Sequence, residues 1–342
     1  MLLLLLQVTT TTPASPQLKW DGIVDVYADA GTPRAPAGLR TWMTQPRDDR
    51  SIALNLAAVG ATWSTDKVRA RFSVQAGTSV VANYAGEPDL LGVRMIEEGY
   101  VGVHATKSLW VDAGIFGSAI GMEAWRTTED PTYTRSLTAD YTPYYSAGVR
   151  ALWQAGPALA LRADLVNGWQ RIGENNDAKA LALRADWSPR STLLVGGSTF
   201  VGNERPEGST PVIRTFGQLY ARLGAADRTA LWFTADLGGE GERRFGSVTA
   251  ILRRPLSERV AVNVRGEFYA DPHQVIYVTG TPEGINGVGV SAGVDLAIAP
   301  GVQWRTEARW IGAEARIFPD AAGGAAKGAG FLVTALTFRW AE

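Results

Sequence analysis

The sequence predicts an all-β fold: a closed antiparallel transmembrane β-barrel of about sixteen strands, with short periplasmic turns and long extracellular loops. Three observations lead to this prediction. Apolar and polar residues alternate in many segments, the connections between these segments are short and long in turn, and tryptophans gather near the short connections. An alternation with a period of two means that each strand has one apolar and one polar face.

The clearest alternating segment is KVRARFSVQAG, residues 67–77. Val68 and Phe72 belong to its apolar side, and Arg69 and Arg71 belong to its polar side. Similar segments recur along the chain, and helical periodicity is missing outside the longest connection. The predicted strands are residues 19–28, 51–63, 67–77, 96–106, 108–117, 142–154, 158–168, 179–188, 191–201, 212–223, 229–238, 244–254, 259–270, 287–298, 301–312 and 331–341.

The connections between these segments differ in length according to their position. Those after even-numbered segments are short, as in STDK, TKS and AGP. Those after odd-numbered segments tend to be long: residues 29–50, 78–95, 118–141, 169–178, 202–211, 239–243, 271–286 and 313–330. Outer-membrane barrels have this arrangement, and strands of about ten tilted residues span their apolar band. A soluble β-sandwich or lectin also alternates, but nothing makes it place a long loop at every second connection.

Tryptophan positions are an independent indication of a membrane barrel. Several lie on the apolar side within a few residues of the short turns: Trp20, Trp153, Trp187, Trp304 and Trp340. Indole rings collect at membrane interfaces because they are apolar with one polar N–H. Trp110 and Trp232 depart from this pattern, since they lie on the polar side. Lipid offers no partner for an open strand edge, so residues 19–28 are expected to pair with residues 331–341.

Composition excludes several classes of protein. The chain has 342 residues, a net charge of -1 and no cysteine, so nucleic-acid binding through a basic field, disulfides and zinc-thiolate sites are not expected. No apolar run approaches the roughly 18 residues of a membrane-spanning helix. Residues 1–17 begin with a leucine-rich run and are interpreted as a signal-peptide remnant or a disordered leader. Residues 18–342 are interpreted as the barrel.

Three stretches carry a family resemblance: EEGYVGVHATKSLWVDAGIFGSAIG (97–121), EAWRTTEDPTYTRSLTADYTPYYSAGVRALWQ (123–154) and LALRADLVNGWQ (159–170). A strand leads into a Gly-rich bend, a long loop follows with Tyr133 and the pair Arg135-Ser136, and a strand returns. In these features the chain resembles the OmpL-like β-barrel porins of bacterial outer membranes. The resemblance implies an outer-membrane channel. The C-terminus departs from it, because Trp340 is followed by two further residues where such barrels often end on an aromatic one.

A barrel of about sixteen strands encloses a lumen wide enough for water. The polar side of each strand is then expected to line the pore, where neighbouring cations meet water and counter-charges instead of a dry core. The predicted pore-lining residues are Arg69, Arg71, Arg150, Arg162, Arg184, Arg214, Arg265, Arg305, Glu307 and Arg309. Arginines outnumber acids on this wall, so it is expected to favour anions modestly. The alternative for any single residue is a solvated wall position with no selective role.

The longest connection, residues 118–141, is the best candidate for a functional site. By analogy with general porins, whose loop at this place folds inward, it is expected to narrow the lumen. The predicted constriction residues are Glu123, Trp125, Arg126, Glu129, Asp130, Tyr133 and Arg135. Acids here, opposite wall arginines, set up a transverse field that sorts charged solutes. The alternative is a plain surface loop.

No catalytic or metal site is indicated. His104 and His273 are the only histidines, and the acidic loops lack EF-hand spacing, so we expect neither an enzyme nor a cofactor. The predicted function is passive diffusion of small hydrophilic solutes through a lipid-embedded outer-membrane porin, for which a homo-oligomer is a further expectation. Two alternatives stay open. One is a plugged barrel that binds partners through residues 29–50, 271–286 and 313–330, and the other is a soluble all-β binding protein.

Overall fold

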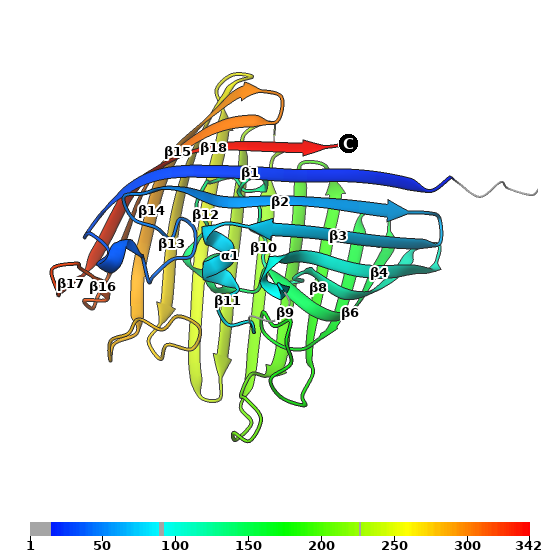
Figure 1. Ribbon diagram of the computed structural model, residues 1–342, viewed down its shortest axis with the longest axis horizontal. Coiled ribbons are helices and arrows are strands. Elements are labelled where there is room, and N and C mark those ends of the chain that lie inside the picture. The colour runs from blue at the N-terminus through cyan, green and yellow to red at the C-terminus, as the bar shows by residue number, and fades with distance from the viewer. Residues whose placement is uncertain (1–14, 89–91, 226) are drawn as a thin grey trace, which may run out of the picture.

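The computed structural model describes residues 15–88, 92–225 and 227–342. Within these residues, sixteen strands form one closed antiparallel barrel (Figure 1). They are β1 (Gln17–Thr32), β2 (Ile52–Ser64), β3 (Val68–Ala76), β4 (Ile96–Thr106), β5 (Leu109–Gly117), β6 (Tyr145–Gly156), β7 (Leu159–Val166), β8 (Ala180–Arg190), β9 (Leu193–Asn203), β10 (Ile213–Leu223), β11 (Ala230–Glu240), β12 (Arg243–Pro255), β13 (Val260–Asp271), β14 (Ile285–Ala299), β15 (Val302–Ala313) and β18 (Gly328–Ala341). The predicted fold class is confirmed. Residues 1–14 of the predicted leader lie outside the described residues.

The first and last strands close the barrel. Asp21 of β1 stands opposite Ala341 of β18, and the pairing continues to Thr32 opposite Gly330. All other barrel strands pair with the strands before and after them in the sheet order. Closure leaves no row of unpaired backbone groups facing lipid, which is the condition for a sheet to span a membrane.

One connection differs from the predicted alternation of lengths. Residues 241–242 alone join β11 to β12, so this connection is a tight hairpin, whereas the others after odd-numbered barrel strands are longer. Gly241 has a φ of 62°, a left-handed conformation that glycine adopts without steric cost. A two-residue hairpin of this kind requires such a conformation.

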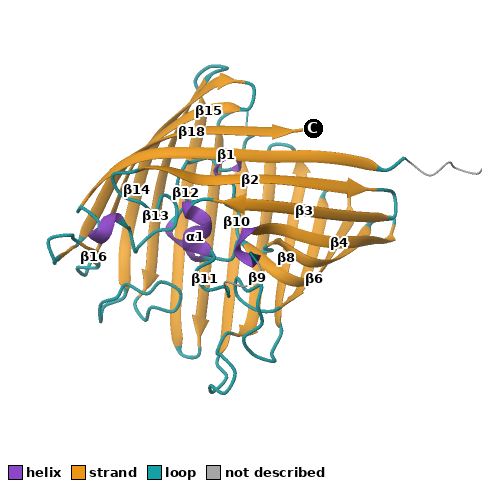
Figure 2. Cartoon of the chain, viewed as in Figure 1, coloured by secondary structure: helices purple, strands orange, loops and turns teal. Residues whose placement is uncertain are grey.

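Helices are short pieces within the long connections (Figure 2). They are α1 (Thr78–Asn83), α2 (Leu137–Tyr141) and the 3-10 turns η1 (Pro36–Gly38), η2 (Val93–Met95) and η3 (Thr127–Glu129). The small hairpin of β16 (Phe318–Pro319) and β17 (Ala325–Ala326) lies in the connection before β18. In the described part of the chain, no helix is long and apolar enough to cross a membrane.

The outer face of the barrel is apolar. In β3, Phe72 is 58% exposed on the outside, whereas the neighbouring Ser73 is fully buried. Trp20, Trp153, Trp187 and Trp304 are each about half exposed on the same outer face. The barrel therefore exposes large apolar side chains on its outer face, where a soluble protein has polar ones, as the alternation in residues 67–77 predicts.

The buried core lies inside the barrel, where the long connections fold inward. Trp42 and Met43 of the β1–β2 connection and Phe318 of β16 pack with Tyr27 and Phe331 of the wall. The Trp42 and Phe318 rings meet edge-on, with centroids 5.4 Å apart. The long connections thus fill part of the lumen at their own end of the barrel.

Candidate functional site

The connection between β5 and β6, residues 118–144, crosses the lumen, and we call it the lumen loop. Thr127 Oγ1 donates to Asp25 on β1 at 2.8 Å. Thr138 is hydrogen bonded to Ser247 on β12. Four strands separate β1 from β12 in the shorter direction around the barrel, so the loop contacts walls that are far apart in the sheet.

Two buried ion pairs on β13 and β15 hold the middle of the lumen loop. Glu307 accepts hydrogen bonds from the backbone N and Oγ1 of Thr134 at 2.7 and 2.9 Å, and Arg265 donates to Glu307 at 2.9 Å. Arg309 pairs with Glu267 at 2.5 Å and donates to a loop carbonyl at 2.7 Å. None of these four wall side chains is more than 1% exposed. Buried charges need pairing and further hydrogen bonds, and the loop backbone supplies them.

The predicted pore-lining residues therefore form two groups. Arg265, Arg305, Glu307 and Arg309 were expected to face water, but each is at most 4% exposed beneath the lumen loop. Arg305, for example, donates to the carbonyl of Asp130 at 3.1 Å and pairs with Asp295 at 2.9 Å. Alternation in the sequence gives the side of the strand on which a residue lies, but not what covers that side.

The other six predicted arginines lie around the lumen loop, and each pairs with a carboxylate. Arg150 among them was also expected to face water, but it is only 7% exposed. Arg71 belongs to the network described below. The remaining pairs join Arg69 and Arg150 to Asp112, Arg162 to Asp164, Arg184 to Asp186 and Arg214 to Glu240, at 2.6 to 2.7 Å. These carboxylates come from the barrel wall itself, so most of the positive charge of the wall is compensated within the wall.

A chain of alternating charges joins the wall to the lumen loop. Arg71 on β3 pairs with Glu98 and, at 2.6 Å, with Asp21 on β1. Arg126 of the loop pairs with the same Asp21 and with Glu97, both at 2.6 Å. We call these five residues the charge ladder. Its three carboxylates outnumber its two guanidinium groups, which leaves one negative charge.

The sequence reasoning missed the three acids of the charge ladder. Glu97 and Glu98 are neighbours, so regular alternation puts only one of them inside. In the structure Ser73 pairs with Glu98 and Val74 pairs with Ile96, so Glu97 is the extra residue of a β-bulge. Both glutamates consequently turn inward. Asp21 lies on the inward side of β1 according to regular alternation, so the sequence pattern was sufficient to predict its position.

A cavity of about 550 Å³ lies beside the charge ladder. Arg126 and Trp125 of the lumen loop border it together with Arg184 and Arg339 of the wall. Glu129 also borders it, 4.0 Å from Arg339, and its side chain is 47% exposed. The cavity extends from Arg339, near the short-turn end of β18, to Gly117, where β5 ends and the lumen loop begins.

Two other loop acids, Glu123 and Asp130, are bound within the loop, and of these Glu123 also borders the cavity. Asp130 accepts from the backbone N of Ala124 at 2.6 Å, and its other carboxylate oxygen has no partner. Burial, and then the charge of Glu123, raise the pKa of Asp130 well above its usual value. Burial likewise raises the pKa of Glu123, which accepts from the backbone N of Ser136 at 2.9 Å. Of the three predicted acids, Glu129 alone combines exposure with a wall partner.

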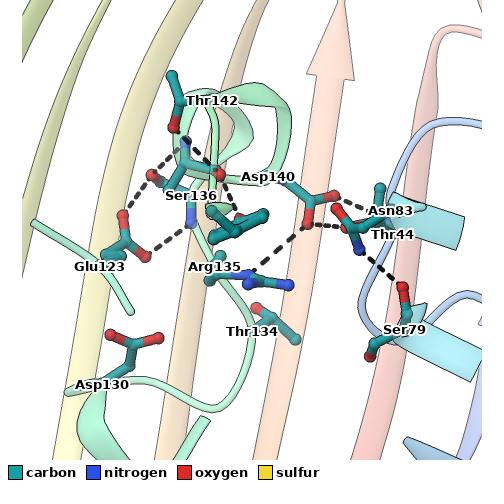
Figure 3. Close-up of polar contacts among 12 residues, drawn as sticks. Thr44, Ser79, Asn83, Glu123, Asp130, Thr134, Arg135, Ser136, Asp140 and Thr142 are labelled. Atoms are coloured by element: carbon teal, nitrogen blue, oxygen red, sulfur yellow. Dashed lines mark hydrogen bonds and ion pairs between the residues drawn. The ribbon is translucent and has the colours of Figure 1, made fainter. Parts of the chain in front are cut away.

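The remaining predicted constriction residues stabilise the loop from within. The Arg135 guanidinium lies 5.4 Å from the Trp125 ring and 4.0 Å from the Tyr144 ring, and 3.8 Å from Asp140. Asp140 accepts from the backbone N of Thr44 at 2.6 Å, which ties the loop to the β1–β2 connection (Figure 3). Tyr133 donates to Asp25 on β1 at 3.1 Å.

A sequence-family comparison identifies the chain. The model of the family described as "Putative beta-barrel porin-2, OmpL-like" matches residues 17–339. The chain belongs to this family. It is therefore an OmpL-like porin of the bacterial outer membrane. A search of curated proteins finds no match.

Solved structures with the fold of this OmpL-like porin are outer-membrane proteins. OmpT of Vibrio cholerae is 11% identical, with 95% of this chain and 98% of that chain covered and a TM-score of 0.61. The outer-membrane channel DcaP of Acinetobacter baumannii is 9% identical, with 95% and 97% covered and a TM-score of 0.65. A mutant of Rh. blastica porin is 12% identical, with 95% and 100% covered and a TM-score of 0.59. At these identities the likeness shows the barrel fold alone.

Proposed function

We propose that this OmpL-like porin passes small hydrophilic solutes by passive diffusion and that these solutes contact the cavity beside the charge ladder. The observation that carries the proposal is a cavity with charged walls inside a barrel whose outer face is apolar. The apolar face suits lipid, and the charged cavity suits hydrated solutes. The charged residues of the wall and the lumen loop that we propose to meet the solute are Asp21, Arg71, Glu97, Glu98, Arg126, Glu129, Arg184 and Arg339.

We further propose that the selectivity of this pore is set by the charge ladder and Glu129. The excess of arginines on the strands led to the expectation of a modest anion preference. That expectation left out Asp21, Glu97 and Glu98, which compensate Arg71 and Arg126. Arg184 pairs with Asp186, and Arg339 lies 4.0 Å from Glu129, so both of these arginines are compensated. The one net negative charge of the ladder then remains, and the proposed preference is for small cations.

Planar-bilayer recording tests this function. The purified, refolded barrel is expected to give single-channel conductance that rises with salt concentration, and a reversal potential in a KCl gradient on the cation-selective side. Heat-modifiable gel mobility shows that the barrel is folded. A folded barrel without conductance would eliminate the channel and would favour a plugged barrel that acts through its loops. A reversal potential on the anion-selective side would eliminate the role proposed for the ladder.

We also propose that the porin assembles with copies of itself. One solved structure of Vibrio cholerae OmpT is described as a trimer form. The apolar outer face of this barrel can be covered by lipid or by a second barrel. Chemical cross-linking in native outer membrane, followed by gel electrophoresis, is expected to give a discrete oligomer band. A purely monomeric pattern in native membrane would contradict this proposal.

A further inference from the structure

Three phenylalanines point into the lumen near the end that carries the long connections. Phe200 on β9, Phe216 on β10 and Phe245 on β12 are each about 2% exposed. The rings of Phe216 and Phe245 stack with centroids 6.0 Å apart. The lumen of a water-filled barrel is lined by polar side chains, so a group of inward phenylalanines departs from the expected pattern. Their burial shows that other side chains cover them.

The covering side chains come from two long connections. Trp169, between β7 and β8, meets Phe200 and Phe216 edge-on at centroid distances of 5.0 and 5.4 Å. Val275 and Ile276, between β13 and β14, pack into the same cluster. We call these six residues, Phe200, Phe216, Phe245, Trp169, Val275 and Ile276, the aromatic plug. Ala119 and Ile120 of the lumen loop belong to the same cluster, so the plug adjoins that loop.

A single carboxylate fastens the β13–β14 connection over the plug. Asp271, fully buried at the end of β13, accepts hydrogen bonds from the backbone N–H groups of Val275, Ile276 and Tyr277 at 2.7, 3.0 and 3.0 Å. Asp271 is itself held in the wall, where it pairs with Ile285 of β14. Hydrogen bonds to an ionised carboxylate are stronger than those between neutral groups. The connection is therefore attached to the wall by a compact, charge-assisted latch.

We propose that the aromatic plug is a hydrophobic gate at the long-loop end of the lumen, and that the connection of residues 272–284 is its moving part. An apolar constriction excludes ions by excluding the water that hydrates them. Opening withdraws Val275 and Ile276 from the plug and breaks the latch on Asp271. This inference rests on the proposed channel function, because a gate has meaning only in a conducting lumen.

Two variants of different chemistry test the gate in planar bilayers. Asp271→Asn keeps the shape of the latch and removes its charge, and the Val275→Ser/Ile276→Ser double variant makes the plug polar. Each is expected to raise the open probability by about tenfold, the effect of weakening the closed state by one set of charge-assisted hydrogen bonds. Val278→Ser is the matched control, since Val278 belongs to the same connection but is 71% exposed. It is expected to leave conductance unchanged.

The absence of cysteine from the chain permits a second measurement that does not depend on the latch. A single Val275→Cys variant, treated with a cationic methanethiosulfonate reagent during recording, is expected to show a lasting rise in conductance, because the attached charge prevents the plug from closing. Val278→Cys is expected to react without a change. Equal conductance for the native barrel and all plug variants would overturn the gate and leave the channel function standing. No conductance from any folded barrel would overturn both.

Discussion

At the scale of single residues, inward arginines on different strands have different environments although their sequence patterns are the same. Arg71 borders the cavity and pairs with Asp21 and Glu98. Arg265 is fully buried against Glu307 and Thr134 of the lumen loop. The difference comes from the residues opposite each arginine, which belong to distant parts of the chain. A role in solute selection is therefore proposed for Arg71, and a role in holding the loop follows for Arg265.

Glu129 and Asp130 are expected to contribute unequally to ion selectivity. Glu129→Gln removes an exposed charge and is expected to move the reversal potential toward anion selectivity. Asp130→Asn is expected to change it little, because burial already favours the neutral form of Asp130. Reversal potentials in a KCl gradient measure both. If the double variant behaves as the native barrel does, neither acid belongs to a selective constriction.

Glu307 is expected to be essential for the position of the lumen loop. Glu307→Ala leaves Arg265 buried without its nearest charge partner and Thr134 without its acceptor. Breaking a buried pair by removing one partner costs about 3–5 kcal/mol. Urea unfolding in detergent micelles, followed by tryptophan fluorescence, measures the loss. Glu307→Gln is the matched control, since it keeps an acceptor oxygen, and it is expected to lose less. An equal loss in both variants would contradict the contribution of this hydrogen bond.

At the scale of the element, each strand places one face toward lipid and the other toward the lumen, and a β-bulge can change which residues lie on each face. β3 follows regular alternation along its whole length, so the sequence predicts its outer residues correctly. β4 contains an extra residue at Glu97, so a fixed period of two cannot predict that Glu97 and Glu98 both face inward.

Phe72 is expected to tolerate only apolar replacement, because its side chain is 58% exposed on the apolar outer face of β3. Phe72→Arg is expected to destabilise the folded barrel by up to about 2–4 kcal/mol, the cost of an arginine at the bilayer midplane. The folded fraction after refolding into lipid vesicles, read from heat-modifiable gel mobility, measures this. Phe72→Leu is expected to fold normally. Normal folding of the arginine variant would show that this face of β3 is not in contact with lipid.

At the scale of the whole molecule, the barrel is a closed wall with much of its buried core inside the lumen. The lumen loop, the β1–β2 connection and the β13–β14 connection all fold inward. Burial in this interior raises the pKa of three loop acids, Glu123, Asp130 and Asp140. We therefore expect the stability of the loop to depend on pH.

The lumen loop is expected to loosen as pH rises. A carboxyl whose pKa is higher in the folded than in the unfolded state stabilises the fold fully below the unfolded value, and this stabilisation is lost as pH rises toward the folded value. The pH range in which this stabilisation is lost therefore begins near the ordinary carboxyl pKa of about 4 and extends to higher pH. Hydrogen exchange of residues 123–140, corrected for intrinsic rates, is expected to show less protection at about pH 8 than at about pH 5. Asp130→Asn is expected to reduce this difference, and protection that grows with pH would contradict it.

The sequence by itself determined the barrel. Alternation with a period of two, connection lengths and tryptophan positions are local or periodic signals, and they correctly predicted the strands, the closure and the apolar outer face. They also indicated residues 118–141 as the candidate functional site. These signals are visible in one dimension because lipid and water impose the same condition on every strand.

Only the tertiary structure decided which inward residues border a cavity and which are covered. Glu307 binds Thr134, which is more than half of the chain away in sequence. Asp21 on β1 pairs with Arg71 on β3 and with Arg126 of the lumen loop, so this contact joins three separate elements. The plug formed by Phe200 and Val275 likewise depends on a connection folding back across the barrel. Contacts of this kind depend on which segments meet in space, and no period along the chain encodes that meeting. The sequence therefore determined the strands of the wall, and the packing of the loops against the wall decided which wall residues border the cavity.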